Sequence, residues 1–115
     1  MSDTLVDTSA WVAFLRGDPA AIQRIDPLLA GGRAAITGPV AAEVLSGART
    51  RPEFDLLGRL LQGLDRLPEP DSVWERVAEH RFALARQGYK ASLVDLVIAL
   101  TALDGKHALL TRDTD

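Results

Sequence analysis

Four acidic residues stand in unusual settings, either shortly after an apolar run or inside one. Carboxylates seldom occupy such surroundings unless they are paired or coordinated. Several carboxylates that converge on one place cannot all stay ionised unless protons or cations offset their charge, so a shared site would call for a cation. The four residues are Asp7, Glu43, Asp95 and Asp113.

The ligand types available to such a site indicate which cation it would take. The chain has no cysteine, and its two histidines, His80 and His107, lie outside any zinc-ligand spacing. Oxygen ligands alone select Mg²⁺ or Mn²⁺ over zinc, with water completing the shell. Ser9, two residues beyond Asp7, offers a hydroxyl to the same shell or lies in a helix start for structural reasons.

Each acid also has a purely structural explanation. Asp7 can cap the helix that begins near residue 8 or 9, and Glu43 can gain from the helix dipole if it lies in a first turn. Asp95 has capping-box spacing from Ser92, and Asp113 can belong to an ordinary turn. Both explanations stay open for each residue, but a shared crevice accounts for all four acids at once.

The elements that must position these acids alternate between strand and helix. Short apolar runs bounded by turn residues predict strands, and apolar residues at helical spacing predict helices. We expect strands at 5–6, 34–37, 66–68 and 107–111, with helices at 9–15, 19–29, 40–48, 52–64, 71–87 and 92–104.

Two of the expected helices carry further predictions. In the helix over 71–87 we expect an Asp71-Ser72 cap and an inward-facing set of Val73, Val77, Phe82 and Leu84. The helix over 52–64 carries an apolar stripe that serves either the core or a partner.

Alternating strands and helices favour a parallel sheet, because parallel strands need crossover connections. The predicted fold class is therefore α/β, a three-layer α/β/α sandwich with a sheet of four to five strands. In such a fold the carboxyl ends of the strands form the binding crevice. Asp7 and Asp113 follow the first and last strands, so we expect both at that edge.

Composition limits the class of protein. The chain has 115 residues, of which 47% are hydrophobic and 25% charged, with a net charge of -3. These values are ordinary for one globular domain and exclude a uniformly basic nucleic-acid binder. No apolar stretch is long enough for a membrane span and no signal peptide is recognisable, so we expect a cytoplasmic protein without membrane contact.

The ordered set of motifs resembles the PIN-domain nucleases, and specifically the VapC toxins of bacterial and archaeal toxin–antitoxin pairs. No single motif is specific, but the set covers essentially the whole chain. The matching segments are Leu-Val-Asp-Thr-Ser at 5–9 with Trp11, Glu43 early in a helix, Val-Asp-Leu-Val-Ile-Ala at 94–99, and Leu-Leu-Thr-Arg-Asp at 109–113.

This resemblance implies a Mg²⁺- or Mn²⁺-dependent endoribonuclease that is a homodimer and is inhibited by a VapB-type antitoxin. Asp7, Glu43, Asp95 and Asp113 occupy the family's four acidic positions. Three of them, Asp7, Asp95 and Asp113, would be the main metal ligands, while Glu43 is either a ligand or the group that positions or deprotonates the water. A free-standing PIN nuclease in RNA processing and an inactive PIN-fold interaction module are the alternatives.

The resemblance also bears on domain organisation. We expect residues 1–115 to form a single PIN-like nuclease domain. The family usually continues beyond this point with an aromatic residue, a last strand and more chain, so we expect the native C-terminal tail to be lacking. The role of Asp115 stays open.

An RNA substrate approaching these acids needs cations near them. The candidates for phosphate contact are the basic residues nearest in sequence to the acids or their helices, although ordinary surface charge explains each of them as well. They are Arg49, Arg51, Arg86, Lys90 and Arg112, with Ser9 as a polar neighbour.

Overall fold

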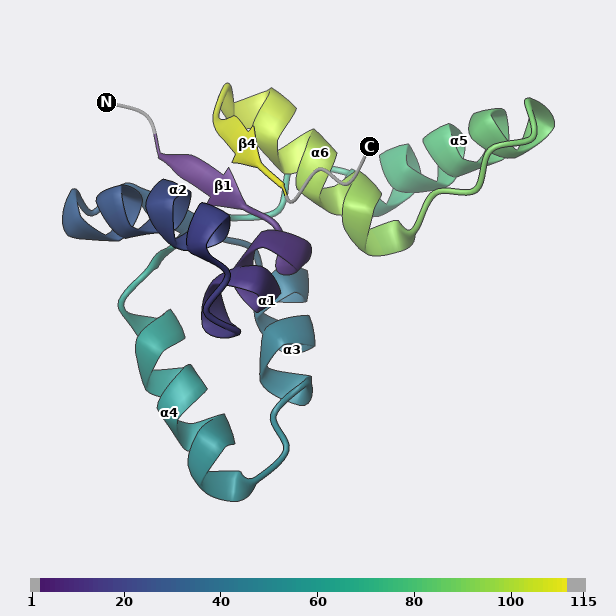
Figure 1. Cartoon of the computed structure of the whole chain (residues 1–115). Helices are drawn as coiled ribbons and strands as arrows, with labels where there is room; N and C mark the ends of the chain where they lie inside the picture. The colour runs from purple at the N-terminus through teal and green to yellow at the C-terminus, as the bar shows by residue number, and fades with distance from the viewer. Residues whose placement is uncertain (1–2, 112–115) are drawn as a thin grey trace.

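A computed structural model describes residues 3–111 of the chain, which fold around a parallel four-stranded sheet (Figure 1). The strand order is β3-β2-β1-β4, and every neighbouring pair is parallel. The predicted α/β class with a parallel sheet is therefore confirmed. The strands are β1 (Thr4–Val6), β2 (Ala34–Ile36), β3 (Asp65–Arg66) and β4 (Ala108–Leu110).

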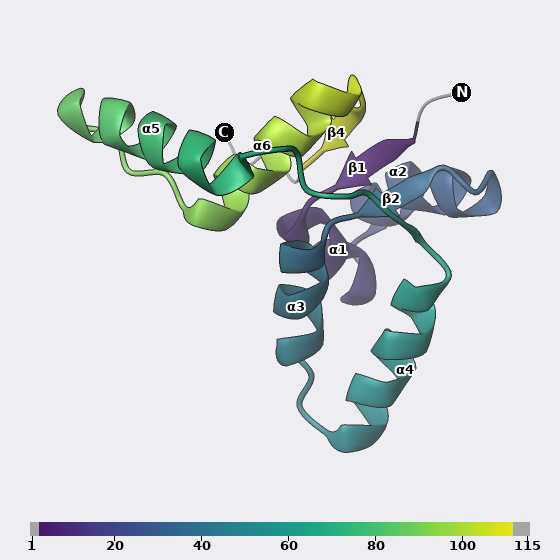
Figure 2. The same ribbon diagram turned by 180° about the vertical axis from the view of Figure 1, so that it is seen from behind.

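The central strands are buried because helices cover the sheet on both sides. Figures 1 and 2, taken together, place α2 and α6 on opposite faces, as right-handed crossovers to the two sides of β1 require. Strand β1 pairs with β2 and with β4, so it lies inside the sheet. The helices are α1 (Thr8–Leu15), α2 (Pro19–Ala30), α3 (Gly38–Ser46), α4 (Arg51–Gln62), α5 (Val73–Arg86) and α6 (Leu93–Gly105).

The main core lies between the sheet and the helices that follow β1 and β2. Its largest fully buried side chain is Trp11, whose ring meets Phe14 edge-on at 6.0 Å between centroids. Strand residue Leu5 is fully buried beside Trp11 in the same cluster. Because Trp11 is on α1, this packing fixes α1 and the β1–α1 junction against the sheet.

Helix α5 packs on α6 through a second, smaller apolar cluster that includes Val73 and Val77. Arg76 of α5 and Asp104 of α6 reinforce this contact with two hydrogen bonds of 2.7 and 2.9 Å. Both side chains are partly exposed, so the packing rather than the ion pair supplies most of the attachment.

Two sequence predictions for α5 were wrong. Phe82 does not pack inward but is 61% exposed, because the C-terminal half of α5 extends away from the body of the molecule (Figure 1). Ser72 precedes the helix with a left-handed backbone, φ 54°, and makes no side-chain cap. The helical period correctly located α5, but one apolar position on it has no neighbouring element to pack against.

Helices α3 and α4 form a hairpin that projects from the sheet (Figures 1 and 2). The stripe predicted on α4 serves the core in part: Leu61 is buried, and Leu57 packs against the core cluster. Phe54, at the distal end, remains 37% exposed. Within residues 3–111, no helix has the length and apolar character needed to cross a membrane.

Candidate active site

Asp7 lies at the carboxyl end of β1 and is the N-cap of α1. Its Oδ1 accepts hydrogen bonds from the Ala10 backbone N–H at 3.0 Å and from the Ser9 hydroxyl at 2.9 Å. The predicted cap is therefore present, and it uses one carboxylate oxygen. The other oxygen accepts no hydrogen bond from the part of the chain that the structure describes, so capping leaves half of this carboxylate free for a ligand.

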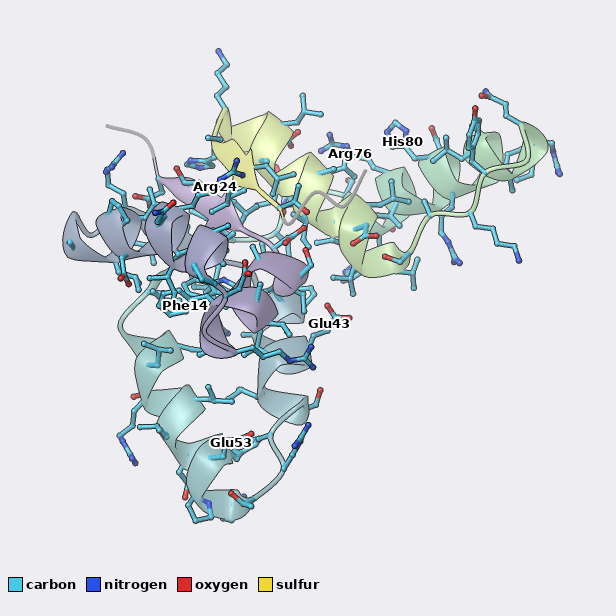
Figure 3. The ribbon with its side chains drawn as sticks, viewed as in Figure 1. Phe14, Arg24, Glu43, Glu53, Arg76 and His80 are labelled. Atoms are coloured by element: carbon cyan, nitrogen blue, oxygen red, sulfur yellow. The ribbon has the colours of Figure 1, made fainter. Side chains whose placement is uncertain are left out.

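Glu43 is held beside the start of α1 by a contact between residues 35 positions apart. The Thr8 hydroxyl donates a hydrogen bond of 2.6 Å to Glu43 Oε1. Helix α3 begins at Gly38 and has no acidic residue in its first turn, so the helix-dipole explanation for Glu43 was wrong. An exposed carboxylate bonded to the residue next to Asp7 is instead what a shared site requires (Figure 3).

The end of β4 adjoins Asp7 directly. The Asp7 backbone N–H donates to the Leu110 carbonyl at 3.0 Å, and the Ser9 and Thr111 hydroxyl oxygens are 3.5 Å apart. The carboxyl ends of β1 and β4 therefore meet at one edge, as the sequence predicts. The remaining acid at this strand end, Asp113, and the neighbouring Arg112 lie outside the described residues.

Asp95 lies in the first turn of α6 with an exposed side chain. The Ser92 hydroxyl accepts the Asp95 backbone N–H at 2.9 Å, which confirms Ser92 as the N-cap. The Asp95 carboxylate itself makes no hydrogen bond or ion pair within residues 3–111, so the reciprocal half of a capping box is absent. Because α6 packs against α3, Asp95 is on a helix that adjoins the one carrying Glu43.

The donor chemistry of this edge fits a hard divalent cation. Asp7, Ser9 and Glu43 provide only oxygen atoms, which suit Mg²⁺ or Mn²⁺. Among residues 3–111, no three acidic, histidine or cysteine side chains come close enough to hold an ion without further ligands. The described part of the site is thus a pair of carboxylates linked through Thr8.

The four predicted basic residues that the structure describes do not gather around this pair. Arg49 and Arg51 are at the tip of the α3–α4 hairpin: the Arg49 backbone N–H bonds Glu53 at 3.0 Å, and Arg51 pairs with Asp55 at 3.2 Å. Figure 3 shows Glu53 nearer that tip than Glu43. Arg86 and Lys90 are on the outer part of α5 and in the loop after it.

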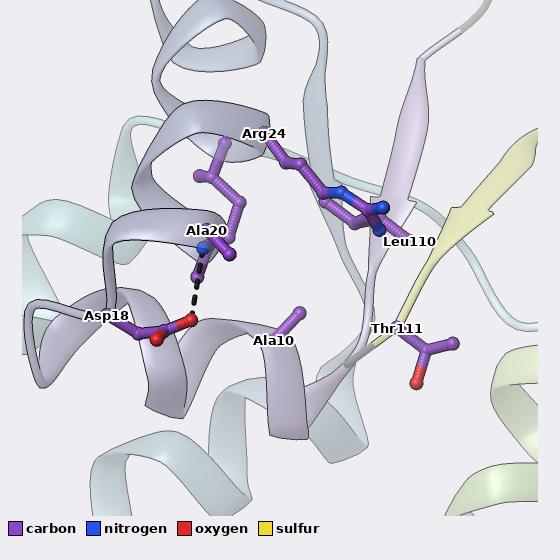
Figure 4. A pocket seen from close by; sticks show the side chains of 8 residues that line it. Ala10, Asp18, Ala20, Arg24, Leu110 and Thr111 are labelled. Carbon is purple, nitrogen blue, oxygen red and sulfur yellow. Dashed lines mark hydrogen bonds between the residues drawn. The ribbon is translucent and has the colours of Figure 1, made fainter. Parts of the chain in front are cut away.

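A cation that sequence reasoning missed is Arg24 of α2. It lines a pocket of about 350 Å³ together with Leu110 and Thr111 (Figure 4). Asp18 also lines this pocket. It is the N-cap of α2, and its carboxylate accepts a hydrogen bond from the Ala21 backbone N–H at 3.2 Å. No sequence motif marks Arg24, because only the fold brings this residue of α2 into one pocket with Leu110 and Thr111.

We expect Thr8→Val to lower any metal-dependent activity of this site by about 10- to 100-fold, the usual effect of removing a residue that orients a ligand. Valine keeps the shape of threonine but cannot donate the 2.6 Å bond to Glu43. Ser46→Ala is the matched control, because within residues 3–111 the Ser46 hydroxyl bonds the Glu43 backbone carbonyl, at 3.1 Å, and not its carboxylate. Equal rates for Thr8→Val and wild type would show that Glu43 needs no positioning.

Comparison with known proteins gives a consistent set of similarities. The family model described as PIN domain matches residues 4–115. Ribonuclease VapC11 of Mycobacterium tuberculosis is 35% identical, with 96% of this chain and 87% of that protein covered.

Two solved structures resemble the fold. A toxin–antitoxin complex from Klebsiella pneumoniae matches with TM-score 0.76 and 25% identity, covering 98% of this chain and 88% of that one. FitAcB from Neisseria gonorrhoeae matches in fold with TM-score 0.67 and 22% identity, covering 96% and 88% of the two chains.

Proposed function

We propose an RNA-cleaving function for this chain, which belongs to the PIN-domain family and, within it, to the VapC ribonucleases. Its proposed biological role is that of the toxin in a toxin–antitoxin pair, which the similarity to VapC ribonucleases and to a solved toxin–antitoxin complex supports. The observation that carries the proposal is the Asp7–Thr8–Glu43 arrangement at the carboxyl edge of the sheet. A single PIN-like domain and a VapB-type antitoxin partner belong to the same proposal, as does a homodimer.

The chemistry assigned to the site is metal-dependent hydrolysis of a phosphodiester bond, with Mg²⁺ or Mn²⁺ as the cofactor. The bound cation supplies Lewis-acid stabilisation of the charge that develops on the scissile phosphate. Asp7, Asp95 and Asp113 are the proposed ligands. Only oxygen donors are involved, in agreement with the cysteine-free composition.

The remaining residues have positioning and binding roles in this proposal. Thr8 holds Glu43 through its 2.6 Å hydrogen bond, so that Glu43 can orient a water or complete the ligand set. Ser9 holds Asp7 from its own helix turn at 2.9 Å. Among residues 3–111, Arg24 is the cation assigned to meet a phosphate, because it lines the pocket that Thr111 also lines.

Removal of divalent metal tests the proposal directly. Purified protein with single-stranded RNA should produce discrete fragments in Mg²⁺ or Mn²⁺ and none in EDTA, as gel electrophoresis of labelled RNA would show. Calcium, a hard cation that tolerates irregular shells, serves as the control for non-specific charge effects.

Failure of any RNA in a broad panel to be cut with either metal would contradict the proposal and favour an interaction module without activity. If RNA is cut, the gene neighbourhood separates the two nuclease roles. A short antitoxin-like reading frame directly upstream favours the toxin over a free-standing RNA-processing nuclease.

A further inference from the structure

The outer part of α5 and the loop that follows it form a pocket away from the carboxylates. The loop runs back from the end of α5 to the start of α6 (Figure 1). The volume of the pocket, about 550 Å³, is within the range of small-ligand sites in proteins. We call it the α5 pocket, and its lining residues are Arg81, Phe82, Ala85, Tyr89, Lys90 and Ala91.

The walls of the α5 pocket are held by specific local contacts. Gly88 has φ 86°, a left-handed conformation that lets the chain reverse after the helix. The Tyr89 backbone N–H then bonds the Leu84 carbonyl at 2.9 Å. Arg81 Nε donates to the Ala91 carbonyl at 3.0 Å, which ties the returning loop to α5. These backbone and side-chain hydrogen bonds therefore fix the shape of the pocket.

Positive charge is concentrated around this pocket in a chain whose net charge is -3. From His80 to Val94 the sequence contains no acidic residue. The three cations of this segment, Arg81, Arg86 and Lys90, form no ion pair with any carboxylate between residues 3 and 111. An anion approaching the pocket therefore meets uncompensated positive charge.

Two exposed aromatic rings face the same pocket. Phe82 is 61% and Tyr89 62% exposed, and both line it. The Arg86 guanidinium lies over the Phe82 ring, 4.0 Å from its centroid. Aromatic faces alternating with unpaired cations are how proteins hold single-stranded nucleic acid, because bases stack on the rings while phosphates meet the charges.

The charge also argues against a protein occupant. Protein interfaces are enriched in aromatic residues and arginine but depleted in lysine, so the charge of the pocket, and not its aromatic rings, separates the two kinds of occupant. Arg81 and Lys90 line the α5 pocket together with both aromatic residues, and a protein surface without acidic side chains would desolvate these cations without compensation. A phosphate backbone offers this compensation at regular spacing.

We propose that the α5 pocket binds an unpaired nucleobase of single-stranded RNA, with Tyr89 and Phe82 as stacking surfaces and Arg81, Arg86 and Lys90 meeting the flanking phosphates. This assignment rests on RNA being the substrate, as proposed above. It adds a site that recognises RNA apart from the carboxylates. The loop connects the two places, because Ala91 of the pocket is four residues before Asp95.

Binding of a short fluorescent single-stranded RNA, measured by anisotropy in EDTA so that no cleavage occurs, tests the proposal. Tyr89→Leu and Phe82→Leu should each weaken binding about 5- to 100-fold, the effect of losing one base-stacking contact. Tyr89→Phe should bind like wild type, because it keeps the ring. Trp74→Leu is the matched control, since Trp74 is an exposed aromatic residue, at 51%, on the same helix but outside the pocket.

An abasic oligonucleotide of the same length and charge provides the decisive comparison. If base stacking accounts for the binding, Tyr89→Leu and wild type should bind the abasic oligonucleotide equally weakly. An equal loss on both oligonucleotides, or no loss on either, would overturn the proposal. So would a Tyr89→Leu variant that binds RNA normally but has a lower oligomer mass in sedimentation, because the pocket would then serve a second copy of the chain.

The metal-dependent cleavage assay separates this inference from the proposed function. Cleavage by wild type, with RNA binding unaffected by Tyr89→Leu and Phe82→Leu, would refute the α5 pocket alone. Base-dependent binding that is lost in both variants, without cleavage in Mg²⁺ or Mn²⁺, would support the pocket and refute the nuclease.

Discussion

Asp7→Asn is expected to reduce metal-dependent RNA cleavage by at least about 100-fold, because metal ligation contributes several kcal/mol to such reactions and about 1.4 kcal/mol corresponds to tenfold in rate. The fold should survive the change. Asparagine caps helices as well as aspartate does, so the hydrogen bond from the Ala10 N–H to the side chain at position 7 can persist. Initial cleavage rates and the midpoint of thermal unfolding by circular dichroism measure the two effects separately.

Asp18→Asn is the control matched to this change. Asp18 caps α2 through the Ala21 N–H just as Asp7 caps α1, so the substitution removes one negative charge and keeps an equivalent cap. We expect its unfolding midpoint and its cleavage rate to stay near those of wild type. Similar cleavage by the Asp7 variant and wild type would reduce Asp7 to a helix cap and remove the basis of the proposed site.

Asp95→Asn should cause a loss of comparable size for a different structural reason. The Asp95 carboxylate makes no hydrogen bond or ion pair within the described residues, and the helix cap at this position uses only its backbone N–H. Stability therefore depends on the carboxylate only weakly, through its place in the first turn of α6, whereas a metal ligand set depends on it directly. We expect cleavage to fall by at least about 100-fold with little change in the unfolding midpoint.

Ser92→Ala gives the opposite pattern and completes the comparison. It removes the 2.9 Å cap on α6 and should cost about 1 kcal/mol of unfolding free energy, read from urea denaturation. The buried side chains of Val97 and Ile98 also hold α6 against the two apolar clusters. The helix should therefore remain in place and cleavage should persist. If Asp95→Asn lost stability but kept cleavage, its role would be local capping and the ligand assignment would be wrong.

Much of the fold could be predicted from the sequence because local patterns encode it. The apolar runs at 5–6 and 34–37 became buried parallel strands, and Asp7 and Ser92 became helix caps. These features depend on a few neighbouring residues, whose backbone preferences and hydrogen bonds are fixed locally. The same reasoning located α5 but not the exposure of Phe82, which depends on where neighbouring elements end.

For the candidate site, the sequence by itself determined which oxygen-bearing residues follow strands and begin helices, and hence the type of cation they suit. Only the tertiary structure decided that Thr8 joins Glu43 to the end of β1, and that Arg24 and Thr111 line one pocket. These contacts join residues far apart in the chain, so they arise from the packing of crossover helices against the sheet. No local residue preference specifies that packing, because it is set by the way the whole core is filled.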